Sequence, residues 1–313
     1  MADNDGQWER GLIEKLATEA LKEQRRARRW GIFWKLLTFT YITVVIVLAV
    51  DWKGGDGIGG KHTALVEING VIAPGTDASA EKVATALQAA FKDKNTQGVV
   101  LRINSPGGSP VQSQEIYDEM KRLRVKYPAI PLYVVVEDLC ASGGYYVAAA
   151  ADKIYVAKGS IVGSIGVRMD SFGVVGLMEK LGIERRLITA GKNKAMLDPF
   201  LPQEESHKQI IVGLIGEIHD QFIAAVREGR GKRLKETPDM YSGLIWSGAK
   251  SIELGLADAL GGLDYVAREV IKAEEIVDYT QKENIAEKVA RRFGAGAMNS
   301  LIEFAVRSGL AIH

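Results

Sequence analysis

Residues 31–50 form a long hydrophobic run, GIFWKLLTFTYITVVIVLAV, that contains one charge, Lys35. The run has no polar face, so a helix made from it would be apolar on every side. Twenty helical residues cover about 30 Å, the thickness of the hydrocarbon layer of a bilayer. Trp30, Trp34 and Trp52 stand near its two ends, as aromatic residues do at membrane interfaces. The pattern predicts a transmembrane helix at 31–50.

The charges on either side of this run predict its orientation. The sequence RRARR at 25–29 precedes the run, and Asp51 and Asp56 follow it. Since positively charged segments stay in the cytoplasm, we expect residues 1–30 to form a charged cytoplasmic segment and the rest to lie across the membrane. A cleaved signal peptide is the alternative, but its leading region would be long and VLAVDW lacks a clean cleavage site. A retained anchor is the better interpretation.

Beyond a Gly-rich linker at 51–62, apolar stretches alternate between the spacing of strands and the spacing of helices. This alternation predicts an α/β domain over residues 63–274, with a mainly parallel sheet and right-handed crossovers. A charged tail at 275–313 follows the domain. The predicted strands are 63–72, 98–104, 131–138, 153–157 and 185–190, and the predicted helices are 79–93, 110–126, 143–151, 174–181 and 203–228.

Composition excludes several classes of protein. Hydrophobic residues make up 47% of the 313 residues and charged residues 25%, as in an ordinary globular protein. A net charge of +1 provides no basic field for nucleic acid. One cysteine forms no disulfide within the chain, and the four scattered histidines include no HExxH pair. We therefore expect no metal site and no cofactor.

Two glycine pairs mark candidate catalytic loops. NSPGG at 104–108 follows one predicted strand, and ASGG at 141–144 follows the next. The carboxyl ends of parallel strands meet at one edge of a sheet, where ligands bind. There Ser142 is a candidate nucleophile, and the N–H groups of Gly108 and Gly143 are candidate donors of an oxyanion hole. Taken singly, Ser142 is better interpreted as a helix N-cap and PGG as a turn, and only together do they favour acyl chemistry. Crotonase-type enzymes use a similar hole without a serine nucleophile.

A serine nucleophile needs a base, and the histidines do not supply one at that edge. None lies between His62 and His207. His207 and His219 occupy ordinary surface and packing positions of the predicted 203–228 helix, and His313 ends the chain. A serine–histidine arrangement is therefore disfavoured.

Lysine is the remaining candidate base. GKNKAMLDPF holds Lys192 and Lys194 and follows the last predicted strand, so we expect it at the same edge of the sheet. Burial would favour the neutral amine that a base requires. Ser164, in VGSIGV, is a candidate hydroxyl to orient that amine. The spacing does not choose between Lys192 and Lys194. The apolar neighbours able to bury either amine are Met196, Leu197 and Phe200.

At these motifs the chain resembles the bacterial signal peptide peptidase A family, membrane-anchored Ser/Lys-dyad proteases with a Clp-protease/crotonase-like fold. The resemblance covers about 63–270 and is to the half-length members. It rests on NSPGG, ASGGYYVAAAADKIYVAKGSIVGSIGV, GKNKAMLDPF and GLIWSGAKSIELGLADALGG, which occur in family order. It implies Ser142 as nucleophile, Lys194 rather than Lys192 as general base, Ser164 as the hydroxyl that holds the lysine, and Gly108 and Gly143 as oxyanion donors.

The resemblance also implies a function. It predicts a serine endopeptidase that hydrolyses signal-peptide remnants and other short hydrophobic peptides. Half-length members assemble into a ring in which serine and lysine come from neighbouring copies, so we expect a homo-oligomer. The expected location is the bacterial cytoplasmic (inner) membrane, with the catalytic domain on the outer, periplasmic side. A crotonase-type acyl-CoA enzyme and a catalytically silent membrane quality-control scaffold are the alternatives. Cys140 is expected to be a small buried residue rather than a thiol nucleophile.

Overall fold

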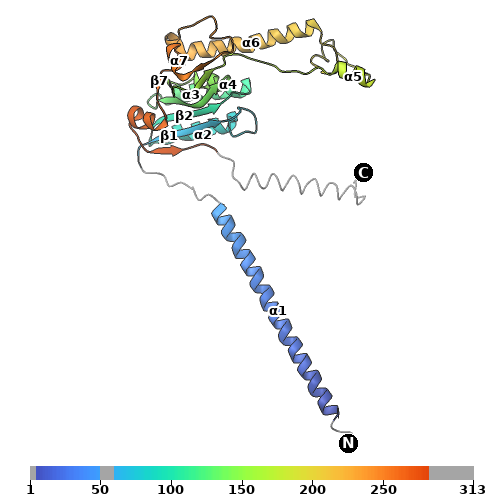
Figure 1. Ribbon diagram of the computed structural model, residues 1–313. Coiled ribbons are helices and arrows are strands. Elements are labelled where there is room, and N and C mark those ends of the chain that lie inside the picture. The colour runs from blue at the N-terminus through green and yellow to red at the C-terminus, as the bar shows by residue number, and fades with distance from the viewer. Residues whose placement is uncertain (1–4, 50–59, 282–313) are drawn as a thin grey trace. The chain divides into compact units, whose positions relative to one another are not determined.

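The computed structural model describes residues 5–49 and 60–281. The chain divides into two compact units, one of which, Gly59–Lys282, contains the sheet. The other unit contains the long helix α1 (Asp5–Ala49) (Figure 1).

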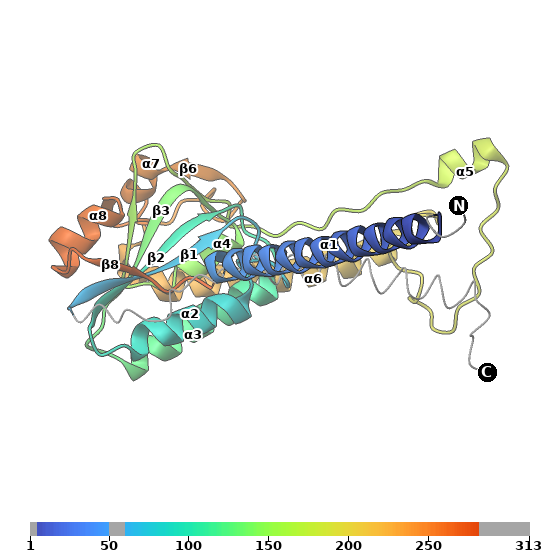
Figure 2. The same ribbon diagram turned by 90° about the horizontal axis from the view of Figure 1, so that it is seen from below.

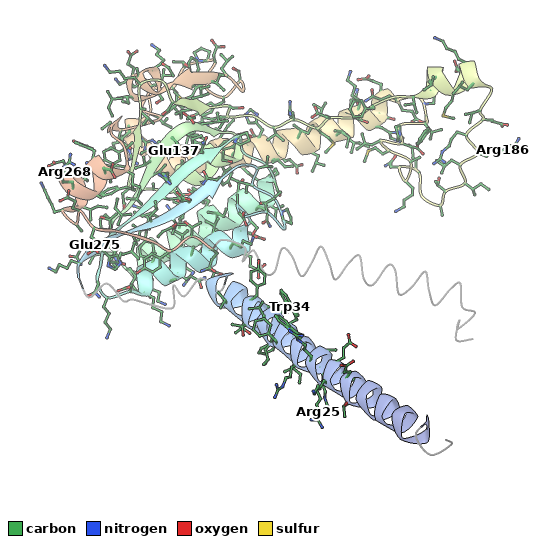
Figure 3. All side chains as sticks on the ribbon, turned by 60° about the horizontal axis from the view of Figure 1, so that its bottom comes forward. Arg25, Trp34, Glu137, Arg186, Arg268 and Glu275 are labelled. Atoms are coloured by element: carbon green, nitrogen blue, oxygen red, sulfur yellow. The ribbon has the colours of Figure 1, made fainter. Side chains whose placement is uncertain are left out.

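Helix α1 runs without a break through 45 residues, where the sequence predicts a charged segment followed by a separate membrane span. Figure 3 shows Arg25 and Trp34 on this helix. The predicted span at 31–50 runs past residue 44, the last of this helix whose side chain is described. Between residues 30 and 44 the large apolar side chains exposed on the helix surface include Trp30, Ile32, Phe33, Trp34, Leu36, Leu37, Phe39, Tyr41, Ile42 and Val44. A helix apolar all round is one that needs a bilayer or a partner to cover it.

The other unit is built on one sheet in the order β6-β5-β3-β2-β1-β8, with β4 pairing β3 and β7. All pairs are parallel except β5 with β6, so the predicted mainly parallel α/β fold is confirmed. The strands are β1 (His62–Asn69), β2 (Thr96–Ser105), β3 (Leu132–Ala141), β4 (Lys153–Val156), β5 (Ile161–Gly163), β6 (Ile245–Ser247), β7 (Ala259–Leu260) and β8 (Ile276–Asp278).

Helices cover both faces of this sheet. On one face, apolar residues of α2, α3 and α4 meet alternate strand residues such as Val66, Leu101 and Val134 in the main core. On the other face, Val266 packs on Val100 in a smaller core. The helices are α2 (Ala80–Lys92), α3 (Pro110–Lys126), α4 (Gly143–Ala148), α5 (Val175–Leu181), α6 (Glu205–Arg230), η1 (Gly231–Arg233), α7 (Gly248–Glu253), α8 (Leu263–Tyr265) and the π-helix η2 (Val266–Ile271).

One segment extends away from the sheet. Residues 167–218, which we call the arm, comprise α5, the loop after it and the first half of α6. Figures 1 and 2 both place α5 beyond the end of α6 that is remote from the sheet. No residue of the arm is buried, although many of its side chains are apolar. The exposed ones include Met169, Phe172, Leu177, Leu181, Ile183, Leu187, Ile188, Leu197, Phe200, Ile210, Val212 and Leu214.

The arm corrects one predicted element. Residues 185–190 do not form a strand but an extended loop, in which the Ile188 side chain is 97% exposed. The apolar residues of the predicted strand, Leu187 and Ile188, are exposed instead. At the other end of the domain, β8 adds residues beyond 274 to the sheet by pairing with β1.

Among the described residues, one helix is long and apolar enough to cross a membrane, the stretch Glu205–Arg233 with a mean hydropathy of 1.3. It consists of α6 and η1, not α1. Its second half packs on the main core through Phe222, Ala225 and Val226. A helix that packs on the core of a globular domain can be equally long and apolar, so we assign no membrane role to α6.

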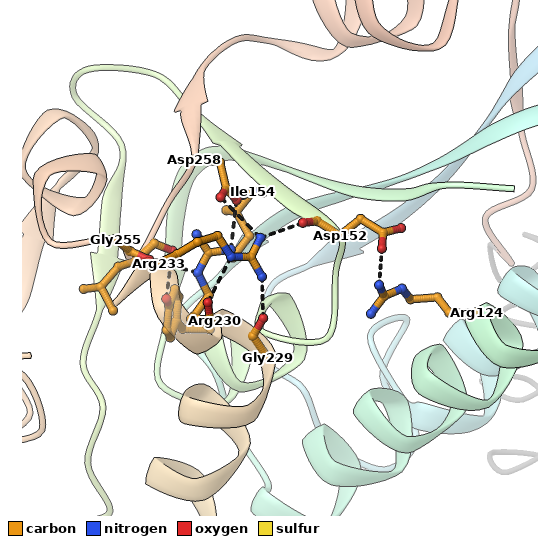
Figure 4. A network of polar contacts seen from close by, with 10 residues as sticks. Arg124, Asp152, Ile154, Gly229, Arg230, Arg233, Gly255 and Asp258 are labelled. Atoms are coloured by element: carbon orange, nitrogen blue, oxygen red, sulfur yellow. Dashed lines mark hydrogen bonds and ion pairs between the residues drawn. The ribbon is translucent and has the colours of Figure 1, made fainter. Parts of the chain in front are cut away.

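A buried ion pair attaches the second half of α6 to the rest of the unit that contains the sheet (Figure 4). The Arg230 side chain is 0% exposed. Its Nε donates to the carbonyl oxygen of Gly255 at 2.9 Å, and its Nη1 donates to Asp258 Oδ2 at 2.8 Å. Asp258 also accepts a hydrogen bond from the Ile154 N–H at 2.7 Å. Gly229 lies so close to α4 that an added Cβ would stand 1.9 Å from the Ala149 carbonyl oxygen.

Asp258→Asn should destabilise the sheet unit by about 3–5 kcal/mol, because it leaves the buried Arg230 without a counter-charge. Burial alone would raise the pKa of Asp258, but hydrogen bonds and the charge of Arg230 lower it overall. This carboxylate therefore stabilises the fold above the ordinary aspartate pKa and loses that effect as pH falls through its lowered value. Urea unfolding followed by pulse proteolysis measures the loss. Glu253→Gln, in the exposed pair with Lys250, is the control and should leave the urea midpoint unchanged.

Candidate active site

Ser142 lies at the corner where β3 ends and α4 begins. Its backbone φ of 52° is positive, which is costly for a residue with a side chain and persists only where the surroundings enforce it. Ser142 occupies the N-cap position, yet its hydroxyl makes no capping hydrogen bond. A strained strand-to-helix turn of this kind presents a nucleophilic serine in other hydrolases. The geometry therefore favours a reactive hydroxyl over a simple cap.

The two glycine loops meet beside this serine. A Cβ added to Gly143 would lie 3.2 Å from the Gly108 nitrogen, so the backbones of the two loops are neighbours. Ile72 pairs with the residues on either side of Gly108: its N–H donates to the Gly107 carbonyl at 2.9 Å, and its own carbonyl accepts from the Ser109 N–H at 2.8 Å. In the described part of the chain, the N–H groups of Gly108 and Gly143 have no acceptor. Two unpaired donors side by side can bind an oxyanion.

Gly143→Ala should lower kcat for peptide hydrolysis by about 10²–10³-fold, the effect of losing one oxyanion donor. The new methyl group would stand 2.4 Å from the Ser113 Oγ, so the loop must move. Adding Ser113→Ala removes that oxygen and should restore part of the activity. Gly159→Ala is the control, because its Cβ would enter open space. Full activity in Gly143→Ala would contradict this assignment of the donor.

Ser164 directly follows β5, the strand whose Gly163 pairs with Ala141 at the end of β3. The N–H of Ser142 donates to the Gly163 carbonyl at 2.8 Å, and the N–H of Ser164 donates to the Leu244 carbonyl at 2.7 Å. Ser164 also has a positive φ, 53°. The fold therefore brings four of the five predicted site residues together, since Gly108 and Gly143 adjoin the same corner.

Lys194 is the predicted site residue that the chain does not bring to Ser142. It is exposed in the arm, in a hollow that is also lined by Met196, Leu197 and Phe200. Figures 1 and 2 both show this part of the arm far from α4, and Arg186 marks its tip in Figure 3. The expectation that GKNKAMLDPF lies at the sheet edge that holds Ser142 is therefore wrong within one chain. The reason is that 185–190 forms no strand of the sheet.

Two further side chains, those of Cys140 and His219, are close to this corner or to the loop of Ser164. Cys140 is fully buried, and burial raises the pKa of its thiol, so it is an inert core residue. His219, on α6, lies nearer the site than its sequence position indicates, with Nε2 3.3 Å from the carbonyl oxygen of Ile165. No sequence pattern indicates that His219 and Ile165 are in contact. Over the described residues, no cluster of three or more His, Cys, Asp or Glu side chains could hold a metal ion.

Two family models match the sheet unit. The model for peptidase family S49 matches residues 125–277, and the model for Clp protease matches 66–159. The first range contains Ser142, Ser164 and Lys194, and the second contains Gly108, Ser142 and Gly143. The putative protease MJ0651 of Methanocaldococcus jannaschii is 33% identical, over 81% of this chain and 85% of that protein. The chain belongs to peptidase family S49. Its mainly parallel sheet is the Clp-protease-like fold.

Other relatives differ in how much of their length is shared. The putative signal peptide peptidase SppA of Enterococcus faecium is 30% identical over 72% of this chain and 67% of that protein. A protein of Brucella abortus (strain 2308) named Na(+)/H(+) antiporter NhaA is 46% identical over 185 residues, which is 59% of this chain and 25% of that protein. The chain thus spans about a quarter of that relative.

Proposed function

We propose that this S49 chain is a membrane-anchored serine endopeptidase with a Ser/Lys dyad. The observation that carries the proposal is Ser142 on a strained strand-to-helix corner, beside the unpaired N–H groups of Gly108 and Gly143. A partly exposed serine hydroxyl next to oxyanion donors is the arrangement that acyl transfer requires. A crotonase-type acyl-CoA enzyme, which would share the fold and the oxyanion hole, is disfavoured by the match to a peptidase family.

The proposed reaction gives each site residue one role. The Ser142 Oγ attacks the scissile carbonyl carbon while the Lys194 amine takes its proton. The carbonyl electron pair moves onto oxygen, where Gly108 and Gly143 donate hydrogen bonds. Cleavage of the C–N bond releases the amine, which takes the proton from the Lys194 ammonium, and an acyl-serine remains. Water then attacks the acyl-serine in the same way, and Ser164 orients the lysine throughout.

The site requires a second copy of the chain in this proposal. Within one chain the loop that contains Lys194 belongs to the arm, and Figures 1 and 2 show the arm extending away from α4, which follows Ser142. The arm exposes a dozen large apolar side chains and buries none of its residues, and exposed apolar surface of that amount is typical of an interaction site. An arm that docks on a neighbouring copy would bury those residues and carry Lys194 to the neighbour's serine. Repeating this head-to-tail contact closes a ring.

The proposed substrates are signal-peptide remnants and other short hydrophobic peptides. The name of the Enterococcus faecium relative and the apolar span of α1 support this class and suggest a membrane-anchored protein. The basic RRARR sequence before the span supports a cytoplasmic amino terminus, which puts the catalytic unit on the outer, periplasmic side of the cytoplasmic membrane.

The test is hydrolysis of short apolar peptides by the full-length chain in detergent, together with labelling by a fluorophosphonate probe. We expect cleavage of apolar peptides, weaker cleavage of matched peptides with charged residues, and covalent labelling at Ser142. A folded protein that neither cleaves peptides nor reacts with the probe would be the silent scaffold instead.

A further inference from the structure

His219 connects the two chain segments between which the arm extends. Ile165 lies two residues before the arm begins, and the chain returns from the arm along α6, where His219 lies about one turn before the first buried residue of that helix, Phe222. The His219 Nε2 lies 3.3 Å from the Ile165 carbonyl oxygen. A carbonyl oxygen only accepts hydrogen bonds, so Nε2 must carry the hydrogen. The outgoing and returning segments are therefore joined by an imidazole hydrogen bond.

The carbonyl that receives this bond belongs to the loop of Ser164. Ile165 is fully buried, and its carbonyl also accepts from the Gly243 N–H at 3.1 Å. One residue earlier, Ser164 has its positive φ, and one residue before that the Gly163 carbonyl accepts the N–H of Ser142. A short, continuous set of bonds thus leads from His219 to the backbone of the proposed nucleophile.

We propose that His219 is a positioning residue for the S49 site: it holds the Ser164 loop, and through it the Ser142 corner, in the strained conformation. This inference rests on the function proposed above. A positive φ at a serine costs roughly 1–3 kcal/mol and survives only when neighbouring contacts hold it. His219 supplies one of the two donors that hold the Ile165 carbonyl. Because His219 is on α6, it also connects the arm to the catalytic corner.

The same geometry separates this role from that of a general base. A base for Ser142 must accept a proton, whereas the ring nitrogen that faces the loop donates one. The Nε2–H is present in both the neutral tautomer and the imidazolium, so the bond survives protonation of the ring. Positioning therefore needs only a hydrogen-bond donor at the place of Nε2. The neutral amide of glutamine can supply that donor.

Two polar substitutions of different reach test the proposal in the full-length chain in detergent. Glutamine places its amide nitrogen near the position of Nε2, while asparagine places it near that of Nδ1. We expect His219→Gln to keep at least half of the kcat for peptide hydrolysis. We expect His219→Asn to lower kcat and the rate of fluorophosphonate labelling about five- to tenfold, the effect of one lost hydrogen bond, with KM changed less than twofold. Asp220→Ala, at the adjacent exposed position, is the control.

The outcomes are distinguishable. Equal activity in His219→Gln, His219→Asn and the wild type would overturn the positioning role. Loss of activity in His219→Gln as complete as in Ser142→Ala would overturn it in favour of a general base. An inactive, unlabelled wild type would overturn the peptidase proposal itself. The urea midpoint of each variant is measured in parallel, and a loss of activity that follows a loss of stability in both variants counts against positioning.

Discussion

Ser142→Ala is expected to abolish peptide hydrolysis by the full-length chain, with kcat reduced by about 10⁴-fold or more. The alanine removes the hydroxyl oxygen that forms the acyl intermediate in the proposed reaction, and the oxyanion donors alone provide little residual rate. The fold should be retained, because the Ser142 hydroxyl makes no capping hydrogen bond whose loss would weaken α4. Initial rates with an apolar peptide and the mass of the oligomer in detergent are the measurements.

The matched control for this variant is Cys140→Ser, two residues earlier on β3. The thiol is buried, and its raised pKa keeps it protonated, so the substitution should leave the catalytic rate nearly unchanged. Fluorophosphonate labelling must disappear in Ser142→Ala and persist in Cys140→Ser. Hydrolysis at the wild-type rate by Ser142→Ala would mean that another residue is the nucleophile.

Lys194→Ala is expected to reduce kcat to a similar extent, because a serine without a base is a weak nucleophile at neutral pH. Lys192→Ala is the matched control from the same loop and should remain active. The spacing of GKNKAMLDPF leaves both lysines open, and only the resemblance to the family favours Lys194. Reversal of the two results would assign the base to Lys192.

The two inactive variants together test whether the dyad is shared between copies. When Ser142→Ala and Lys194→Ala chains are co-expressed in equal amounts, random assembly joins an intact serine to an intact lysine from the neighbour at about a quarter of the contacts in a head-to-tail ring. About a quarter of the wild-type activity should return. If both residues acted within one chain, no activity would return, which would contradict the shared site while leaving the dyad intact.

Much of the fold follows from local patterns. The strands β1 to β4 lie close to their predicted positions because each is a short apolar run bounded by turn residues, and parallel pairing follows from the helices between them. The oxyanion loops were also predictable, since glycine pairs after consecutive strands must reach the same sheet edge. The strand predicted at 185–190 failed because its apolar residues face outward in the arm, and sequence spacing cannot tell a buried apolar run from one exposed for a partner.

By itself, the sequence determined the α/β class, the hydrophobic run of α1, the candidate nucleophile Ser142 and the two glycine loops, because each depends on residues that are neighbours along the chain. Only the tertiary structure decided that Ser142 has a strained backbone, that Gly108 and Gly143 adjoin, that His219 reaches the Ser164 loop, and that Lys194 stands apart in an exposed arm. These features arise where segments far apart in sequence meet or fail to meet. Their contacts, rather than local propensity, determine the backbone angles and distances on which catalysis depends.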